Sequence, residues 1–392
     1  MSPTRRSALA AVAVLSAVVV VPAGASLSSA TATTGVTPQA RPTALVTLGD
    51  SYVSGEAGRW LGNSAVPLGS RAGTDRAWSS AGLGGYDPAK VYGETAKGCD
   101  RSDVAPVLSN DVPVDAKINL ACSGAQTGNV FRASEGGTGQ NGEQPQADQL
   151  AVVAATHDVE TVVLSIGGND LGFASIIQAC VLAHATAARC EESQQAAVDA
   201  AMPQARADVA RAVDEVRAVL AAEGQPADSY CLVLQSYPSP VPRGADNRYA
   251  ELLGGRLGIG GCPIGNSDSD WARDDLVPQI SELVASVAAE RGTDFLDLSD
   301  AFAGREVCAR TASQSTGTPT PETGEWARFL DTDVQGYTQE SLHPNAYGQR
   351  AIGRCYTLLA AAEASARCLN APGRGPDGMY LVPLDLAVGQ GR

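Results

Sequence analysis

The stretch Ala44-Leu45-Val46-Thr47-Leu48-Gly49-Asp50-Ser51-Tyr52 opens the folded part of this chain. Its first five residues form a near-continuous apolar run that ends at a glycine, which is typical of a strand covered on both faces of a sheet. Further runs of this kind occur at 117–121, 161–165, 231–235 and 294–298. The intervening segments predict helices at 146–156, 172–184, 193–222, 270–290 and 345–364. This alternation predicts one α/β domain around a central parallel sheet of about five strands.

Residues 1–32 have the three parts of a secretory signal. Arg5-Arg6 is followed by an apolar run at 8–21, and small residues that suit signal cleavage follow Pro22. The run is shorter than the roughly 20 residues that a membrane span requires, so a removable leader is favoured over a stable membrane anchor. A single arginine pair leaves both the twin-arginine and the general export route open.

We expect a linker at 33–42, one domain at 43–370 and a C-terminal tail at 371–392, in which 380–386 can add an edge strand. Two stretches inside the domain interrupt the alternation of strands and helices. Residues 56–98 are rich in Gly and Ser, and residues 303–340 are rich in Thr, Gly and Pro. Long connections of this kind in a compact domain are usually functional loops or disordered segments.

The chain is acidic, with 28 Lys and Arg residues against 43 Asp and Glu residues and a formal net charge of −15. That charge favours solubility and disfavours nucleic-acid binding, which requires clustered Lys and Arg to displace counterions. With 44% hydrophobic residues, a chain of 392 residues can bury a large core. We expect an extracellular monomer.

Nine cysteines in an exported chain indicate disulfides formed in an oxidising compartment. A Cys-x-x-Cys motif is absent and histidine occurs three times, so we expect no zinc site or other metal site. The sequence does not determine connectivity, but local spacing suggests the pairs Cys99–Cys122, Cys180–Cys190, Cys262–Cys308 and Cys355–Cys368. Cys231 is left over in an apolar run, where a buried, inert thiol is expected.

The three histidines are candidate bases, and their settings differ. His157 follows a predicted helix and can cap its last turn, whereas His184 lies between two cysteines, where a solvated surface side chain is expected. His343 lies in Glu340-Ser341-Leu342-His343-Pro344, and its proline is typical of the first turn of a new helix. An imidazole at this place can face a cleft, although a surface histidine is the simpler interpretation of His343 taken alone.

Ser51 is the candidate nucleophile because it lies where the first predicted strand ends. Ligands of open α/β sheets bind at the carboxyl ends of the strands. No serine lies in a G-x-S-x-G motif, which argues against the α/β-hydrolase arrangement, and the HExxH and P-loop motifs are also absent. Taken alone, an Asp-Ser pair is more often a helix N-cap than a nucleophile site.

Two more strand ends carry groups that can stabilise an anion. Gly124 follows the predicted strand at 117–121 and allows backbone N–H groups to approach a ligand closely. Asn169 follows the predicted strand at 161–165 after two glycines and offers a side-chain amide. The N–H groups of Ser51 and Gly124 and the amide of Asn169 are therefore predicted to converge on one oxyanion. Losing one such donor costs roughly 3–4 kcal/mol in the transition state.

Together, Gly49-Asp50-Ser51-Tyr52, Gly124, Gly167-Gly168-Asn169-Asp170 and His343-Pro344 resemble the four blocks of the SGNH, or GDSL-type, hydrolases. The similarity covers residues 43–365, and secreted, disulfide-bearing actinobacterial lipases and esterases are the most similar group. The resemblance implies a flavodoxin-like three-layer α/β/α sandwich. It also implies that Ser51 attacks an acyl carbon, that His343 passes the proton to the leaving alcohol, and that the three donors above form the oxyanion hole.

One position departs from the family pattern. The family places an Asp three residues before the histidine, and this chain has Glu340 there. Glu340 is predicted to orient His343 as the acid of a triad, although its extra methylene displaces the carboxylate. Some members of the family hold the imidazole with a main-chain carbonyl instead, in which case Glu340 is a solvated residue at the rim of the site.

The leading hypothesis is a secreted carboxylic ester hydrolase, a lipase, esterase or phospholipase, that acts on lipid or small acyl esters without a cofactor. A polysaccharide O-deacetylase of the same architecture is a second hypothesis, because an acetyl ester suits the same site. A catalytically silent carbohydrate- or lipid-binding module is a third, and the joint presence of a nucleophile and a base argues against it.

Five other residues near these blocks have simpler interpretations. Trp60, Trp78 and Tyr52 can line an acyl groove, although single aromatic residues in loops more often contribute to packing. Asp50 and Asp170 are expected to hold the turns beside them through hydrogen bonds between side chain and backbone.

Overall fold

The computed structural model describes residues 40–63, 87, 89–93, 98–251, 254–314, 320–330, 337–362 and 364–386. The predicted leader at 1–32, most of the linker at 33–42 and parts of both long loops lie outside these residues. The chain divides into two units, Met1–Ala40 and Arg41–Arg392, and all described structure beyond Ala40 belongs to the second.

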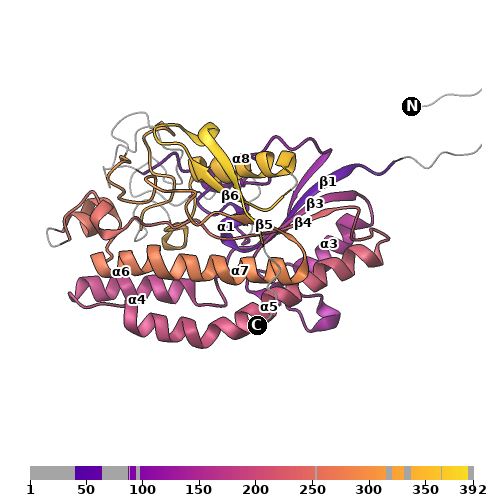
Figure 1. Ribbon diagram of the computed structural model, residues 1–392, viewed down its shortest axis with the longest axis horizontal. Coiled ribbons are helices and arrows are strands. Elements are labelled where there is room, and N and C mark those ends of the chain that lie inside the picture. The colour runs from indigo at the N-terminus through magenta and orange to yellow at the C-terminus, as the bar shows by residue number, and fades with distance from the viewer. Residues whose placement is uncertain are drawn as a thin grey trace, which may run out of the picture. The chain divides into compact units, whose positions relative to one another are not determined.

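Among the described residues, seven strands form one sheet in the order β2-β1-β3-β4-β5-β6-β7 (Figure 1). The strands are β1 Thr43–Gly49, β2 Ala116–Asn119, β3 Asp158–Ser165, β4 Cys231–Gln235, β5 Asp294–Asp297, β6 Ala366–Asn370 and β7 Met379–Pro383. Each neighbouring pair from β2 to β6 is parallel, and β7 runs antiparallel to β6 at the edge. The prediction of an α/β fold with a mainly parallel central sheet is confirmed.

Four of the five strands predicted from apolar runs, β1, β3, β4 and β5, lie inside the sheet, whereas β2 lies at its edge and is half-buried. β1 pairs with both β2 and β3, and every residue of β1 after Thr43 is buried, which explains the continuous run. β7 occupies the place where an edge strand was considered possible. β6 was not predicted, because its sequence Ala-Arg-Cys-Leu-Asn alternates between buried and half-buried positions instead of forming a continuous apolar run.

Eight α-helices are present in the described part of the chain: α1 Ser51–Ser54, α2 Ala89–Tyr92, α3 Gln146–Ala154, α4 Phe173–Ala185, α5 Glu191–Ala222, α6 Asn266–Trp271, α7 Val277–Arg291 and α8 Ala346–Ala362. All five predicted helices are found. The helix predicted at 270–290 comprises α6, a π-helical segment at Ala272–Leu276 and α7. α4 extends to Ala185, so His184 lies in its last turn.

Helices cover both faces of the sheet. Figure 1 shows α5 and α7 along one side of the strands and α8 on the other. α7 contacts β4 and β5, while α5 packs against both α3 and α7. None of the helices in the described ranges is long and apolar enough to cross a membrane. The arrangement leaves the carboxyl ends of β1, β2 and β3 next to one another at one edge of the sheet.

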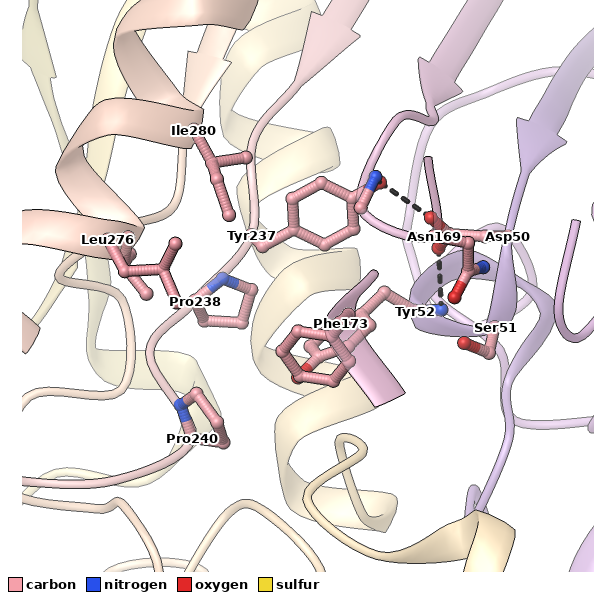
Figure 2. A pocket seen from close by; sticks show the side chains of 12 residues that line it. Asp50, Ser51, Tyr52, Asn169, Phe173, Tyr237, Pro238, Pro240, Leu276 and Ile280 are labelled. Atoms are coloured by element: carbon pink, nitrogen blue, oxygen red, sulfur yellow. Dashed lines mark hydrogen bonds between the residues drawn. The ribbon is translucent and has the colours of Figure 1, made fainter. Parts of the chain in front are cut away.

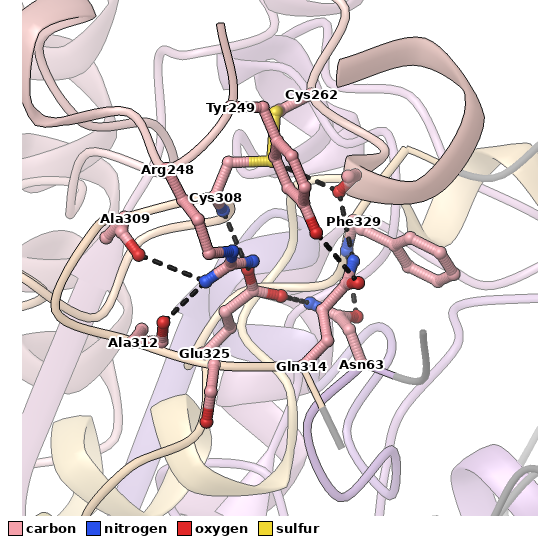
Figure 3. Close-up of polar contacts among 12 residues, drawn as sticks. Asn63, Arg248, Tyr249, Cys262, Cys308, Ala309, Ala312, Gln314, Glu325 and Phe329 are labelled. Atoms are coloured by element: carbon pink, nitrogen blue, oxygen red, sulfur yellow. Dashed lines mark hydrogen bonds and ion pairs between the residues drawn. A yellow bond between two sulfur atoms is a disulfide. The ribbon is translucent and has the colours of Figure 1, made fainter. Parts of the chain in front are cut away.

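The two long loops meet beside that edge. Asn63 of the first loop donates from Nδ2 to the Ala327 carbonyl, at 2.9 Å, and to Glu325 of the second loop. Glu325 is fully buried, accepts a hydrogen bond from the Cys308 N–H at 2.7 Å and pairs with Arg248 at 2.6 Å (Figure 3). The described parts of these loops are therefore ordered by buried polar contacts, since a buried charge is tolerated only when it is paired.

Four disulfides cross-link the fold, and they are the pairs suggested by spacing: Cys99–Cys122, Cys180–Cys190, Cys262–Cys308 and Cys355–Cys368. The expectation that Cys231 is buried is wrong, because Cys231 is the first residue of β4 and is exposed. The other four residues of β4 are buried. The apolar run thus predicts the strand correctly, but Cys231, at the amino end of β4, is exposed to solvent.

Candidate active site

The end of β1 places Ser51 at the carboxyl edge of the sheet. Gly49 has a φ of +141°, and a Cβ atom there would lie 2.0 Å from the Ser165 carbonyl oxygen, so only glycine fits between β1 and β3. Asp50 is the N-cap of α1, and its Oδ1 accepts a hydrogen bond from the Tyr52 N–H at 3.1 Å. The cap is Asp50 and not Ser51, whose side chain therefore remains available in the first turn of α1.

Ser51 contacts His343 directly. The distance from Ser51 Oγ to His343 Nε2 is 2.7 Å, and both residues are buried. His343 precedes α8 in a segment that is paired with Arg328: Arg328 N–H donates to the His343 carbonyl and Leu342 N–H donates to the Arg328 carbonyl, each at 2.7 Å. Tyr52 Oη also donates to the Leu342 carbonyl at 3.1 Å. The helix that carries Ser51 is thereby tied to the segment that carries His343.

The other imidazole nitrogen is held by the main chain. His343 Nδ1 lies 3.1 Å from the Ser341 carbonyl oxygen, which assigns the proton to Nδ1 and leaves Nε2 as the acceptor. Burial lowers the pKa of His343 to about 4, and hydrogen bonds to backbone carbonyls only partly oppose that effect. The imidazole is therefore neutral at neutral pH, which is the form that can accept a proton.

The structure does not bring the predicted acid, Glu340, to His343. The Glu340 carboxylate is fully buried and accepts hydrogen bonds from Trp60 Nε1 at 2.8 Å and from Tyr92 Oη at 3.3 Å. Among the described residues, Glu340 contacts His343 only through its main-chain carbonyl, which accepts the His343 N–H at 3.3 Å, and the imidazole Nδ1 faces the Ser341 carbonyl instead of the carboxylate. The predicted role of Glu340 as orienting acid thus finds no support in the geometry, and Glu340 is not a solvated rim residue either. Its two donors are 280 and 248 residues away in sequence, so the pattern around Glu340 gave no signal of them.

Gly124 and Asn169 lie in the same cavity as Ser51 and His343. This cavity has a volume of about 410 Å³. Gly124 has a φ of +72°, and Asn169 Nδ2 donates to the Ala125 carbonyl at 2.9 Å, which docks the loop after β3 on the loop after β2. Within the described residues, neither the Ser51 N–H nor the Gly124 N–H donates a hydrogen bond. Both amides are therefore available to an oxygen atom in the cavity.

Asp50 is the centre of a buried polar chain beneath the site. Its Oδ2 accepts a hydrogen bond from Tyr237 Oη at 2.5 Å, and the Gly168 N–H donates to the same Tyr237 oxygen at 3.2 Å (Figure 2). Burial raises the pKa of Asp50 to about 7. The expected bond from Asp50 to nearby backbone is confirmed, whereas Asp170 bonds across loops, to the N–H and hydroxyl of Thr127.

Apolar side chains surround the reactive groups on two sides. Figure 2 shows Phe173, Tyr237, Pro238 and Pro240 around a pocket beside Ser51. The larger cavity is lined on its apolar side by Phe173, Ile177, Val181 and Leu330. Tyr52 lines the first pocket, but Trp60 lines neither and instead packs 3.7 Å from the Arg328 guanidinium. Trp78 lies outside the described residues.

Glu56 is a buried acid at this site that sequence reasoning missed. Its Oε2 accepts a hydrogen bond from Ser123 Oγ at 2.7 Å and lies 3.7 Å from His343 Nε2. Its Oε1 is buried without a hydrogen-bond partner. Burial raises the pKa of Glu56 well above its usual value, and nearby acids add to the effect. The sequence carried only a weak signal, an acid two residues after α1, because its neighbours come from distant segments.

One cluster of potential metal ligands lies outside the lining of the Ser51 cavity. In the described ranges, the one group with ligand atoms close enough for a metal ion is Cys180, Cys190 and Asp268. Its two sulfur atoms are joined in a disulfide, which removes them as thiolate ligands.

A serine hydroxyl bonded to a buried, neutral histidine at the carboxyl edge of a parallel α/β sheet is the arrangement of a serine hydrolase. The model of the GDSL-like lipase/acylhydrolase family matches residues 47–351. The chain belongs to this family, and it is therefore a GDSL-type lipase or acylhydrolase.

Similar proteins come from Streptomyces. A lipase of Streptomyces rimosus is 28% identical over 352 residues, which cover 89% of this chain and 96% of that protein. Among solved structures, phospholipase A1 from Streptomyces albidoflavus NA297 has a TM-score of 0.49 at 21% identity, over 83% of this chain and 100% of that one. The extracellular lipase from Streptomyces rimosus has a TM-score of 0.45 at 23% identity, over 82% and 100%.

Burial of the Glu56 carboxyl makes the stability of the folded protein depend on pH. Folding raises the pKa of the Glu56 carboxyl above its value in the unfolded chain. Between these two pKa values the folded protein keeps a proton that the unfolded chain has released. The free energy of unfolding therefore falls as the pH rises through this range. Glu56→Gln removes this pH-dependent loss of stability, and its side-chain amide oxygen can still accept the hydrogen bond from Ser123. We expect the melting temperature of Glu56→Gln to exceed that of the unsubstituted protein by a margin that grows from pH 5 to about pH 8.

Glu290→Gln is the matched control, measured by the same thermal unfolding series. Hydrogen bonds from Arg206 and Arg291 lower the pKa of Glu290, so its contribution has the opposite sign. This variant should be less stable at neutral pH, and the difference should vanish as the pH falls through the pKa of folded Glu290. A margin for Glu56→Gln that is independent of pH would contradict the prediction.

Proposed function

We propose that this chain is a secreted serine hydrolase that cleaves carboxylic esters through an acyl-enzyme on Ser51. The observation that carries the proposal is the 2.7 Å contact between Ser51 Oγ and His343 Nε2 at the wall of a cavity that also contains Gly124 and Asn169. The leader-like sequence and the four disulfides support export. No cofactor takes part in the proposed reaction.

In the proposed mechanism, Ser51 Oγ attacks the acyl carbon while its proton passes to His343 Nε2. The ester carbonyl oxygen becomes an oxyanion and accepts hydrogen bonds from Ser51 N–H, Gly124 N–H and the Asn169 amide. His343 then protonates the leaving alcohol, and the acyl group stays on Ser51. In the second half, His343 takes a proton from water, the resulting hydroxide attacks the acyl carbon, and the proton returns to Ser51 as the acid leaves.

The catalytic unit in this proposal is a dyad. The Ser341 carbonyl accepts the Nδ1 proton of His343 and holds the imidazole in the orientation that directs Nε2 at Ser51. A neutral carbonyl stabilises the imidazolium less than a carboxylate does, but it fixes the tautomer and the ring in the same way.

Lipid esters are the proposed substrates. The apolar side chains Phe173, Ile177, Val181 and Leu330 on the cavity wall suit an acyl chain better than a polysaccharide. The name of a similar protein, the lipase of Streptomyces rimosus, supports the same class.

Covalent labelling tests the nucleophile. Incubation with an alkyl p-nitrophenyl phosphonate should attach one phosphonyl group to Ser51, detected by peptide mass spectrometry, and Ser51→Ala should lower kcat by at least about 10⁴-fold. Ser54→Ala, on the same short helix, is the control and should still be labelled at Ser51.

A folded protein that takes no label at Ser51 would support a silent binding module instead. Rates on p-nitrophenyl acetate, octanoate and palmitate and on phosphatidylcholine distinguish the enzyme classes. Activity limited to the acetate would contradict lipid esters as substrates and favour a deacetylase.

Removal of the carboxylate at Glu340 tests the dyad. Because the Ser341 carbonyl rather than Glu340 contacts Nδ1, Glu340→Gln should keep kcat within about tenfold, against the roughly 10⁴-fold loss that follows replacement of the orienting acid in a triad. The same variant should melt at a lower temperature, since Trp60 and Tyr92 both donate to this carboxylate. A loss of 10³-fold or more in correctly folded protein would restore Glu340 as the orienting acid.

The buried histidine sets the acid limit of activity. His343 acts as a base only when neutral, and burial holds its pKa at about 4, so kcat/KM should stay level down to about pH 5 and fall as the pH passes below 4. Initial rates on a soluble ester measure this acid side of the pH–rate profile, and circular dichroism at each pH confirms that the protein is folded. A fall centred near 6.5, the ordinary value for histidine, would show that burial does not control the base.

A further inference from the structure

The peptide unit between Ser123 and Gly124 is held on every side by residues outside the four family blocks. Ser123 N–H donates to the Cys99 carbonyl at 3.0 Å. The Ser123 carbonyl accepts two hydrogen bonds, from Gln140 Nε2 at 3.1 Å and from Asn141 Nδ2 at 3.2 Å. Its hydroxyl donates to Glu56 at 2.7 Å. Every polar group of Ser123 therefore has a partner, whereas the Gly124 N–H donates to no described residue.

The carbonyl bonds determine where the Gly124 N–H points. The C=O and N–H of a trans peptide unit lie in one plane and point in opposite directions, and no described peptide bond is cis. Since Gln140 and Asn141 hold the Ser123 oxygen on their side, the Gly124 N–H is directed to the opposite side, where Gly124 lines the cavity with Ser51 and His343. Neither Gln140 nor Asn141 lines that cavity, so neither would touch a substrate there.

The two amides come from a tight turn that is itself anchored. Gln140 and Glu143 form an antiparallel bridge, and Asn141 and Gly142 between them have φ values of +51° and +83°. Positive φ at both central residues is the requirement of the type I′ turn that Asn-Gly sequences favour. Arg101 fastens the turn: it contacts both oxygens of the Glu143 carboxylate at 2.7 Å and donates to the Ala121 carbonyl at 2.8 Å.

We propose that Gln140 and Asn141 are positioning residues of the oxyanion hole, and that they act through the Ser123 carbonyl on the Gly124 N–H. The inference rests on the proposed function, in which that N–H stabilises the tetrahedral oxyanion. Two effects of these hydrogen bonds both strengthen the donation from the Gly124 N–H to the oxyanion. The hydrogen bonds fix the direction of the peptide, and a carbonyl that accepts two donors polarises its peptide unit, which makes the N–H a stronger donor.

Near-isosteric substitutions test the proposal. Gln140→Glu and Asn141→Asp replace the N–H donors with carboxylate oxygens, which cannot donate to the Ser123 carbonyl. Each should lower kcat about tenfold and the double variant about 100-fold, approaching the 10²–10³-fold loss that follows removal of an oxyanion donor, while KM changes less than twofold. Gln149→Glu is the matched control, because Gln149 Nε2 also donates to a backbone carbonyl, that of Gln144 at 2.7 Å, and it should leave kcat unchanged.

A transition-state probe separates positioning from a merely structural role. An alkyl trifluoromethyl ketone adds to the serine hydroxyl as a tetrahedral oxyanion, so its affinity should fall across the variants in proportion to kcat/KM. The melting temperature should stay close to that of the unsubstituted protein, and Asn141→Asp, whose side chain is exposed, provides the test if Gln140→Glu does not fold.

Variants that keep kcat within twofold would overturn the proposal, as would losses confined to KM or to the melting temperature with the ketone affinity unchanged. These outcomes are distinct from failure of the proposed function, in which Ser51→Ala remains active and the ketone does not bind even to the unsubstituted protein.

Discussion

The hydrogen bond between Ser51 Oγ and His343 Nε2 joins residues that are 292 positions apart, and its length of 2.7 Å leaves little room for error. Ser51 reaches its place because Gly49 allows β1 to pass close to Ser165 and because Asp50 caps α1. His343 reaches its place because its backbone pairs with Arg328. A hydrogen bond from the Tyr52 hydroxyl to the Leu342 carbonyl then joins the segment that carries Ser51 to the segment that carries His343. A displacement of about an ångström in either of these two segments would remove the geometry for proton transfer.

The surroundings of this contact favour neutral groups. Asp50 and Glu56 are buried beside one histidine, and among the described residues their carboxylates accept hydrogen bonds from hydroxyl and backbone N–H groups. Burial raises the pKa values of Asp50 and Glu56 and lowers that of His343, so in each case the uncharged form is favoured. A carbonyl at Nδ1 fits this environment, because it orients the imidazole without adding another buried charge.

The distant loops contribute more to the site than their composition suggested. Trp60 of the first loop bonds to the segment that leads into α8. Its indole N–H donates to Glu340, and its carbonyl accepts the N–H of Ala346, the first residue of α8, at 2.9 Å. These contacts explain why the Glu340 carboxylate turns away from His343, since two donors from another part of the chain satisfy it. Glu56, at the start of the same loop, is likewise held by a distant residue. Ser123 donates a hydrogen bond to its Oε2, which lies 3.7 Å from His343 Nε2.

From the sequence alone follow the α/β architecture, the strands β1 to β5 and the positions of Ser51, Gly124, Asn169 and His343 relative to strand and helix ends. This is possible because four of these strands lie inside the sheet and form apolar runs, and because the carboxyl ends of parallel strands meet at one edge. Only the tertiary structure decided which group faces His343 Nδ1, where Glu56 and Glu340 point, and which side chains hold the Ser123–Gly124 peptide unit. These contacts join segments far apart in the chain, and their bonds are specified by three-dimensional proximity and by the need to satisfy buried polar atoms, neither of which leaves a local pattern.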